Sequence, residues 1–258
     1  MSIQAIQRAS SILALFSLAR PRLGITEISQ TLGLNKPTVH GLVKTLAECG
    51  FLEQDPDTRK YSLGLKIYEL GVILAGSLRI NQVGAGPAQR LATQTGLVCR
   101  LAIWDRNAVL VTLNLFPNSR DVQFQQLGPR VPAFCTALGK AILAALPPRE
   151  LRAYLKGLKF FRFTPYTVTD RPSLEKELIE SRRRGWTEDR KECLMGLACL
   201  ASAIYDHTGR PTASLSLSGD RDQVFGGGIK TRAHQLVQTA REISRCLGHH
   251  PGASSPEG

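Results

Sequence analysis

The sequence lacks the long apolar runs, the aromatic clusters and the paired cysteine motifs that mark several classes of protein. No stretch approaches about 18 consecutive apolar residues, which argues against a membrane span and a membrane partner. Aromatic residues make up only 6% of the chain and form no stacking platform for single-stranded RNA, so RNA binding is disfavoured. The amino terminus has no charged-then-apolar secretory signal, which predicts a cytoplasmic protein.

The six cysteines form no Cys-x-x-Cys pair, and no histidines lie at zinc-finger spacing. We therefore expect no metal site, no cofactor and mostly buried thiols. A catalytic cysteine needs a nearby histidine; Cys199 and His207 fall on one predicted hairpin, but nothing fixes their geometry. The segment AFCTALGKA is only superficially like a phosphate loop, because Phe134 occupies the place of the required glycine. An enzyme is thus an alternative without a supporting motif.

Length and composition favour two domains. A chain of 258 residues with 43% hydrophobic content can bury one large or two ordinary cores. The net charge of +12 suits a polyanionic partner, but residues 1–64 carry 7 Lys/Arg against 5 Asp/Glu, a net of +2, which leaves +10 elsewhere. The excess is either a source of non-specific attraction or a solvated surface, so charge alone does not locate a binding site.

Residues 23–64 have the order of a winged helix-turn-helix: two short helices, a tight turn and a hairpin. In the first helix we expect Thr26 to be the N-cap and Gly33 to end the helix with a positive φ. In the second, Asn35 is the predicted N-cap and Pro37 fits the first turn. The inward stripe of this helix consists of Val39, Leu42, Val43 and Leu46.

The outward face of the second helix is polar and suits phosphates and base edges in a major groove. The hairpin that follows turns at residues 55–58 and places two cations where they can reach the adjacent phosphates. The predicted DNA-binding residues are Lys36, Thr38, His40, Lys44, Thr45, Arg59 and Lys60. A helix-turn-helix that binds only protein partners is the alternative.

Beyond the wing, residues 65–78 and 81–95 are predicted helices, the second ended by Gly96. Two hairpins follow, around residues 105–107 and 206–209, and residues 229–247 form another amphipathic helix. Residues 249–258 are predicted to be disordered. Hairpins with helices packed on them indicate an α+β fold.

Nearly the whole chain resembles the IclR family of bacterial transcriptional regulators. The amino-terminal part of the resemblance lies in IQAIQRASSILALF and FLEQDPDTRKYSLGLKIYELG, and the carboxyl-terminal part in VPAFCTALGKAILAAL and ECLMGLACLASAIYDHTGRPTASLSLSG. The resemblance implies a homodimer or homotetramer whose affinity for double-stranded operator DNA is modulated by a small organic acid. We expect a DNA-binding domain at 1–64, a linker helix at 65–79 and a GAF-like α/β effector-binding domain at 80–248.

The predicted effector site has two parts. Thr136 is a plausible N-cap of a helix, so the free amides of Ala137 and Leu138 form an anion site. The resemblance adds four side chains, Asp189, Cys199, Ser216 and Ser218. The last two alternate along one predicted strand, so both hydroxyls face the same side.

Two positions depart from the pattern of the family. Gly41 stands where the family commonly has an arginine, which removes a long cationic side chain from the recognition helix. Phe134 stands where a histidine is common, which makes the pocket mouth more apolar and favours an acid with an aromatic or aliphatic body. A ligand-binding GAF-like enzyme is the alternative function for this half of the chain.

Overall fold

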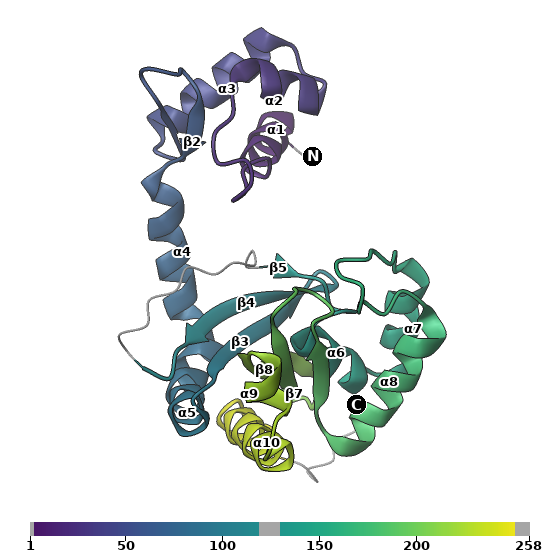
Figure 1. The fold of residues 1–258 in the computed structure, drawn as a ribbon. Helices are drawn as coiled ribbons and strands as arrows, with labels where there is room; N and C mark the ends of the chain where they lie inside the picture. Colours follow the sequence, from purple (N-terminus) through teal and green to yellow (C-terminus); the bar gives the residue numbers. More distant parts are fainter. Residues whose placement is uncertain (1–2, 119–129, 251–258) are drawn as a thin grey trace, which may run out of the picture. The chain divides into compact units, whose positions relative to one another are not determined.

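The computed structural model describes residues 3–118 and 130–250, and it divides the chain into two units, Met1–Gly76 and Ser77–Gly258 (Figure 1). The first unit is a winged helix-turn-helix. Its elements are α1 (Gln4–Leu13), α2 (Ile25–Leu32), α3 (Lys36–Glu48), β1 (Leu52–Gln54), β2 (Tyr61–Leu63) and α4 (Leu65–Ser77). Within the described ranges, no helix is long and apolar enough to cross a membrane.

The start of α2 differs from the expectation. Its N-cap is Gly24, and the carboxylate of Glu27 accepts a hydrogen bond from the Gly24 amide at 2.7 Å. Thr26 lies inside the first turn, so the prediction that Thr26 caps this helix is wrong. The reason is tertiary, because Leu23 exchanges two backbone hydrogen bonds with Tyr61 of β2 and holds the chain extended up to Gly24. The helix therefore begins before Thr26.

The other end of α2 and the start of α3 follow the sequence. Gly33 has φ 66°, the left-handed conformation that reverses the chain at low cost for glycine. The side chain of Asn35 caps α3 by accepting from the Thr38 amide at 2.9 Å. Val39 and Val43 are fully buried beneath α1 and α2, which fixes the opposite face of α3 outward.

The second unit is a six-stranded sheet with helices on both faces. Its elements are α5 (Arg79–Thr95), β3 (Val98–Asp105), β4 (Ala108–Leu115), β5 (Arg130–Val131), α6 (Ala137–Ala145), α7 (Pro148–Gly157), α8 (Arg171–Arg184), β6 (Thr187–Arg190), β7 (Ala198–Tyr205), β8 (Pro211–Gly219), α9 (Arg221–Phe225) and α10 (Ile229–Cys246). The strand order is β5-β4-β3-β8-β7-β6, and every pairing among these strands is antiparallel.

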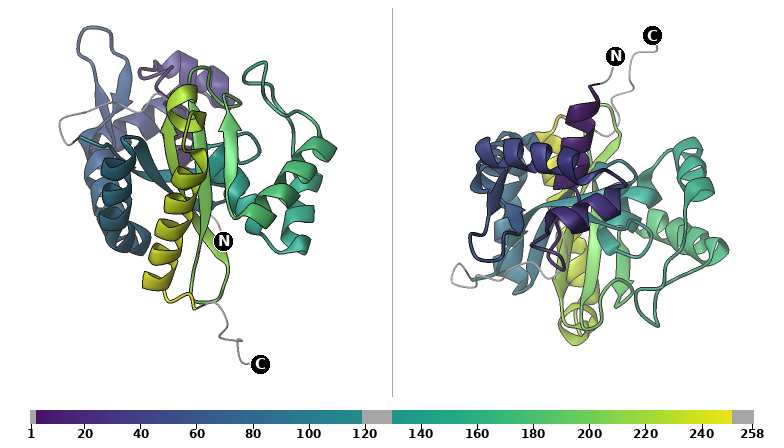
Figure 2. Two further views of the ribbon diagram at one scale, coloured as in Figure 1. Left: turned by 60° about the horizontal axis from the view of Figure 1, so that its bottom comes forward. Right: turned by 90° about the horizontal axis from the view of Figure 1, so that it is seen from above.

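Two hydrophobic cores flank this sheet. On one face, α5 and α10 lie side by side and cover alternate residues of the strands, including Leu101, Leu200 and Leu215 (Figure 2). On the other face, α6 packs against β7 and β8, and α8 packs on α6. The functional candidates of this unit face α6.

The carboxyl-terminal end of the described chain is partly ordered. Of the predicted disordered tail, residues 251–258 lie outside the described residues. His249 is described, and its ring stacks on Tyr205 with 5.2 Å between the ring centroids. His249 thus has an aromatic partner on β7.

Candidate functional site

The outward face of α3 is polar and accessible. Lys36, His40, Lys44 and Thr45 are exposed, and Thr38 is half-buried. Lys36 has no ion-pair partner among the described residues. Lys44 lies 4.0 Å from Glu48, but both side chains are more than 60% exposed, so this pair contributes little and leaves Lys44 available.

The wing holds its two predicted cations differently. Asp55 shapes the turn by accepting from the amides of Asp57 and Thr58, and Arg59 follows with φ 57° and an exposed side chain. Lys60 instead lies 3.4 Å from the carboxylate of Glu27. Since Glu27 also holds the start of α2, Lys60 links the wing to that helix.

Sequence reasoning missed a further cation beside the wing. Arg22 lies 3.1 Å from Asp55 and keeps 59% of its side chain exposed. Its position outside the helix pair gave no periodic signal. The pairing appears only when the hairpin folds back toward the segment before α2.

In the second unit, strand register brings the predicted effector residues together. Asp189 of β6 pairs with Cys199 of β7, which pairs with Ser218 of β8. Ser216 lies two residues along β8 and shares their face, so all four side chains belong to one patch of the sheet. All four are buried.

Several polar atoms of this patch have no partner. The hydroxyl oxygens of Ser214 and Ser216 are buried without a hydrogen bond, and that of Ser218 is buried next to the Cys199 thiol. Native proteins leave few such groups unsatisfied, and a binding site is one explanation for a cluster of them. The strand therefore presents three buried hydroxyls to the face of the sheet that α6 covers.

Arg100 is the residue that sequence reasoning missed here. It is directly opposite Ser216 in the β3–β8 register and so lies on the same face. Its Nε donates to Asn114 at 3.0 Å, whereas its Nη1 is buried without a partner. The sequence did offer a signal, because Arg100 is a charged residue in the otherwise apolar strand VCRLAIW. The alternation of side chains along that strand could have assigned it to the inward face. A half-buried arginine whose Nη1 is buried beside serine hydroxyls suits a carboxylate.

The start of α6 supplies backbone donors. Thr136 caps the helix by accepting from the Gly139 amide at 3.2 Å, and it donates to the Pro132 carbonyl at 2.7 Å. Ala137 and Leu138 occupy the first turn, where an amide has no acceptor within the helix. A Cβ on Gly139 would approach the backbone of Ala133 to 2.2 Å, so only glycine lets this loop pack against the helix.

Phe134 is 3% exposed and lies within an aromatic cluster rather than at an open mouth. Its ring centroid is 5.3 Å from that of Phe160 and 6.3 Å from that of Phe163. Residues of the loop between α7 and α8 thus cover it. Phe134 is therefore part of the apolar interior of the second unit.

Asp189 is held by its own chain. Its Oδ1 accepts from the Glu192 amide at 2.7 Å. Burial raises the pKa of Asp189 to about 7, although Lys140 and the backbone donors act in the opposite direction. The carboxyl is therefore poised to take up a proton near neutral pH. Burial also raises the pKa of the Cys199 thiol to about 12, so this cysteine is a neutral, poorly reactive group.

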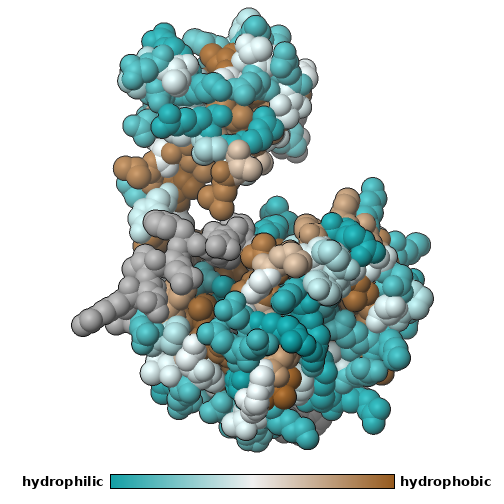
Figure 3. Space-filling model, viewed as in Figure 1, coloured by the Kyte–Doolittle hydropathy of each residue, from teal (hydrophilic) through white to brown (hydrophobic). Residues whose placement is uncertain are grey.

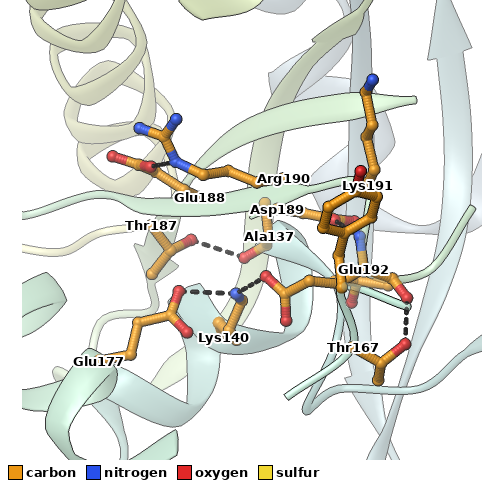
Figure 4. A network of polar contacts seen from close by, with 12 residues as sticks. Ala137, Lys140, Thr167, Glu177, Thr187, Glu188, Asp189, Arg190, Lys191 and Glu192 are labelled. Atoms are coloured by element: carbon orange, nitrogen blue, oxygen red, sulfur yellow. Dashed lines mark hydrogen bonds and ion pairs between the residues drawn. The ribbon is translucent and has the colours of Figure 1, made fainter. Parts of the chain in front are cut away.

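Behind the patch, α6 is tied down by an ion-paired lysine. Lys140 is fully buried, and its Nζ lies 2.6 Å from Glu177 of α8 and 2.6 Å from Glu192 (Figure 4). Burial alone would lower the pKa of Lys140, but the two carboxylates outweigh it and raise this pKa above its ordinary value. A lysine engaged in this way cannot serve as the cation of a phosphate loop.

The predicted hairpin of Cys199 and His207 also bears on catalysis. Cys199 lies near the start of β7, whereas His207 lies in the turn at the far end of the β7–β8 hairpin. Six strand residues span roughly 20 Å. The two side chains cannot form a catalytic pair. Within residues 3–118 and 130–250, no group of three or more His, Cys, Asp or Glu could hold a metal ion.

Comparisons with known proteins match both units. Residues 5–56 match the model of the IclR helix-turn-helix domain, and residues 74–245 match that of the bacterial transcriptional regulator IclR C-terminal domain. The HTH-type transcriptional regulator XynR of Escherichia coli K12 is 35% identical over 247 residues, which cover 96% of this chain and 98% of XynR.

Two solved structures extend the comparison. The Thermotoga maritima IclR is similar with a TM-score of 0.73 and 27% identity, over 96% of this chain and all of that one. An IclR homologue from Microbacterium hydrocarbonoxydans, complexed with 4-hydroxybenzoate, has a TM-score of 0.77 at 23% identity, over 95% of this chain and 99% of that one.

Proposed function

The chain belongs to the IclR family of bacterial transcriptional regulators, and we propose that a small organic acid bound in its second unit modulates its affinity for a double-stranded operator. We assign DNA binding to residues 1–64, linkage to 65–79 and effector binding to 80–248. Because it would bind bacterial DNA, we expect the protein to act in the cytoplasm. We also expect it to have no enzymatic activity.

One observation carries the effector assignment. Buried hydroxyls on β8 and an unpartnered Nη1 on Arg100 lie on the face of the sheet that α6 covers. A carboxylate is the group that would satisfy a guanidinium, hydroxyls and helix amides together. We infer that the acid places its carboxylate against Ala137 and Leu138, with Ser216, Ser218 and Arg100 assisting. Asp189, Cys199 and Phe134 line the remainder.

The DNA-binding surface is inferred from exposed groups on α3 and the wing. Lys36, Thr38, His40, Lys44 and Thr45 share the outward face of α3 and suit a major groove. Arg59 is free to reach a phosphate. Lys60 would have to leave Glu27 or bridge it and the phosphate, so we expect its contribution to be smaller than that of Arg59.

We also propose that the functional unit is a homodimer or a homotetramer. The helix α4 has no buried residue, and its exposed apolar side chains include Leu65, Tyr68, Val72 and Ile73. The brown surface over α4 is visible in Figure 3. A helix of 13 residues is marginal in water by itself, and contiguous apolar surface of this kind marks an interface. A second copy of the chain would cover it.

The decisive experiment measures binding of the full chain to DNA from upstream of its own gene, by fluorescence anisotropy, with and without acids. Acetate, hexanoate, benzoate and 4-hydroxybenzoate span the small, aliphatic and aromatic classes. Ser216→Ala combined with Ser218→Ala should keep DNA binding near normal and abolish the response to the active acid. Ser173→Ala, at an exposed serine of α8, is the control and should respond as wild type.

A separate variant tests the cation. Arg100→Met should weaken acid binding roughly tenfold or more, because a hydrogen bond to a charged group is lost from a buried site.

On the DNA side, Lys44→Ala should weaken binding on all sequences alike and reduce the salt slope by roughly 1 if Lys44 contacts phosphate. Full operator affinity in a fragment of residues 80–258 would contradict the DNA assignment, and unchanged acid affinity in the serine variant would contradict the pocket.

A further inference from the structure

A cavity lies in the same unit, and none of the proposed effector residues lines it. It encloses about 400 Å³, which is within the usual range for small-molecule sites. It is bounded by the carboxyl-terminal halves of α6, α8 and α10 and by the end of β7. The effector amides are at the start of α6, whereas Ala141, Ala144 and Ala145 of its later turns line this cavity, so the two sites are about 5–10 Å apart along the helix.

The floor of this cavity is an open strand edge. The pairing of β6 with β7 reaches only as far as Thr187 and Ala201. Residues 202–205 of β7 therefore have no strand partner on that side among the described residues. The hydroxyl of Ser202 donates to the Gly185 carbonyl, and that of Ser244 accepts from the Tyr205 amide. The Ser244 hydroxyl thus takes the place of a strand partner for the Tyr205 amide, and both hydroxyls belong to residues that line the cavity.

The charged residues of the lining are all arginines. Arg182, Arg241, Arg245 and His249 line the cavity, and no Asp or Glu does. Arg182 is fixed by hydrogen bonds from its guanidinium to the carbonyls of Ala144 and Leu146 at 2.6 and 2.7 Å. Arg241 and Arg245 stand one turn apart on α10, and neither has an ion-pair partner among the described residues.

Helix dipoles alone do not account for this concentration of charge. Three helix carboxyl termini approach the cavity, and each carries the equivalent of roughly −0.5 charge. Three guanidinium groups exceed their sum. Arg182 already neutralises the end of α6, so Arg241 and Arg245, both exposed, remain as a like-charged pair that a bound anion would stabilise.

From these contacts we propose that the cavity binds a small organic dianion, a dicarboxylate or a phosphate monoester, at Arg241 and Arg245. The apolar body of the ligand packs against Ala141, Ala144 and Trp186. Arg182 adds a third, pre-oriented cation. This site is independent of the proposed effector site, because it uses neither the hydroxyls of β8 nor Arg100.

Isothermal titration calorimetry of the full chain tests this with three probes of similar size: phenyl phosphate, phthalate and benzoate. The two dianions should bind, and the monoanion benzoate should bind at least about tenfold more weakly at this site. Arg241→Ala with Arg245→Ala should reduce dianion affinity at least about tenfold. The matched control, Arg171→Ala with Arg221→Ala, removes the same charge from two exposed surface pairs and should leave affinity unchanged.

Three outcomes would overturn the proposal. Equal loss in the two double variants would show non-specific attraction to net charge. Loss of dianion binding in the Ser216→Ala, Ser218→Ala variant, with retention in the α10 variant, would show that the probes occupy the effector site. A change of molar mass in the α10 variant by light scattering, with probe affinity intact, would make this face an interface between copies. If the effector assignment proves wrong, the effect of the Arg241→Ala, Arg245→Ala variant on dianion binding still tests this cavity.

Discussion

Gly41 is the residue of α3 whose change is easiest to interpret. It lies mid-helix on the exposed face, and a Cβ added there meets nothing within 4 Å. Gly41→Ala should raise the free energy of unfolding by about 0.5–1 kcal/mol, because alanine loses less backbone entropy. Chemical denaturation followed by circular dichroism measures this. Gly33→Ala is the contrasting control, since Gly33 has φ 66°, and it should destabilise by about 1 kcal/mol. Stabilisation by both changes would contradict this account.

Asp189 predicts how acid binding depends on pH. The bound acid brings a second negative charge into the pocket that Asp189 lines, so the complex favours the protonated side chain. The pKa of Asp189 is about 7, and the effector acid is ionised across the range from pH 6 to 8.5. Affinity should therefore be nearly constant below pH 7 and fall by roughly tenfold per unit above it.

The matched change is Asp189→Asn, which keeps the shape and removes the charge. Its acid affinity should be nearly independent of pH between 6 and 8.5, measured by calorimetry in buffers of equal ionic strength. Because Asp189 is mostly ionised in the free protein above pH 7 and the complex favours its protonated form, wild type takes up a proton on binding in that range. An affinity that rises with pH in wild type would show that Asp189 does not adjoin the carboxylate.

Among the elements, α6 depends most on a single ion-paired residue. Lys140→Met keeps the volume but leaves the carboxylates of Glu177 and Glu192 without their cation. Removing one partner of a buried ion pair typically costs about 3–5 kcal/mol, and we expect a loss of that size in the free energy of unfolding. Urea denaturation measures the loss. Arg171→Met breaks a pair with Glu175 that is 48% and 39% exposed, and it should cost less than about 1 kcal/mol. Equal losses would contradict a special role for Lys140.

Elements with a strong local signal were predictable from the sequence. The α3 helix has its cap, its proline and its apolar stripe within 13 residues, and the hairpin around Arg106 and Asn107 has two residues with positive φ in its turn. The N-cap of α2 was not predictable from local pattern, because its start is set by the pairing of Leu23 with a residue 38 positions away. Nearby residues determine α3 and this hairpin, whereas a tertiary contact determines where α2 begins.

The candidate effector site divides in the same way. The alternation of Ser216 and Ser218 and the cap at Thr136 were predictable, because both are properties of a few consecutive residues. Arg100 joins the patch only through the β3–β8 register. The aromatic cover over Phe134 comes from a loop more than 20 residues away, and the cavity beside α10 requires four separate elements. Sequence periodicity carries none of these long-range pairings.

For the molecule as a whole, most of the net positive charge lies outside the unit that is proposed to recognise DNA. Residues 1–64 carry a net charge of +2 out of +12. Of the cations near the wing, Arg22 and Lys60 are already paired with Asp55 and Glu27. The DNA-binding unit therefore relies on a few placed cations, and one copy would make few phosphate contacts. Doubling the surface by symmetry is the direct way to gain affinity and specificity.

Self-association through α4 is therefore the prediction on which function of the whole molecule depends. Tyr68→Ser with Ile73→Ser removes two large exposed apolar side chains, 72% and 68% accessible, from the proposed interface. Wild type should be at least a dimer by light scattering at the concentration that binds DNA, with a near-palindromic footprint. The variant should dissociate and lose most of its operator affinity. Leu18→Ser, at a leucine 76% exposed outside α4, should behave as wild type. A monomeric wild type that protects a single half-site would contradict the prediction of a dimer, because each copy would then bind its site alone.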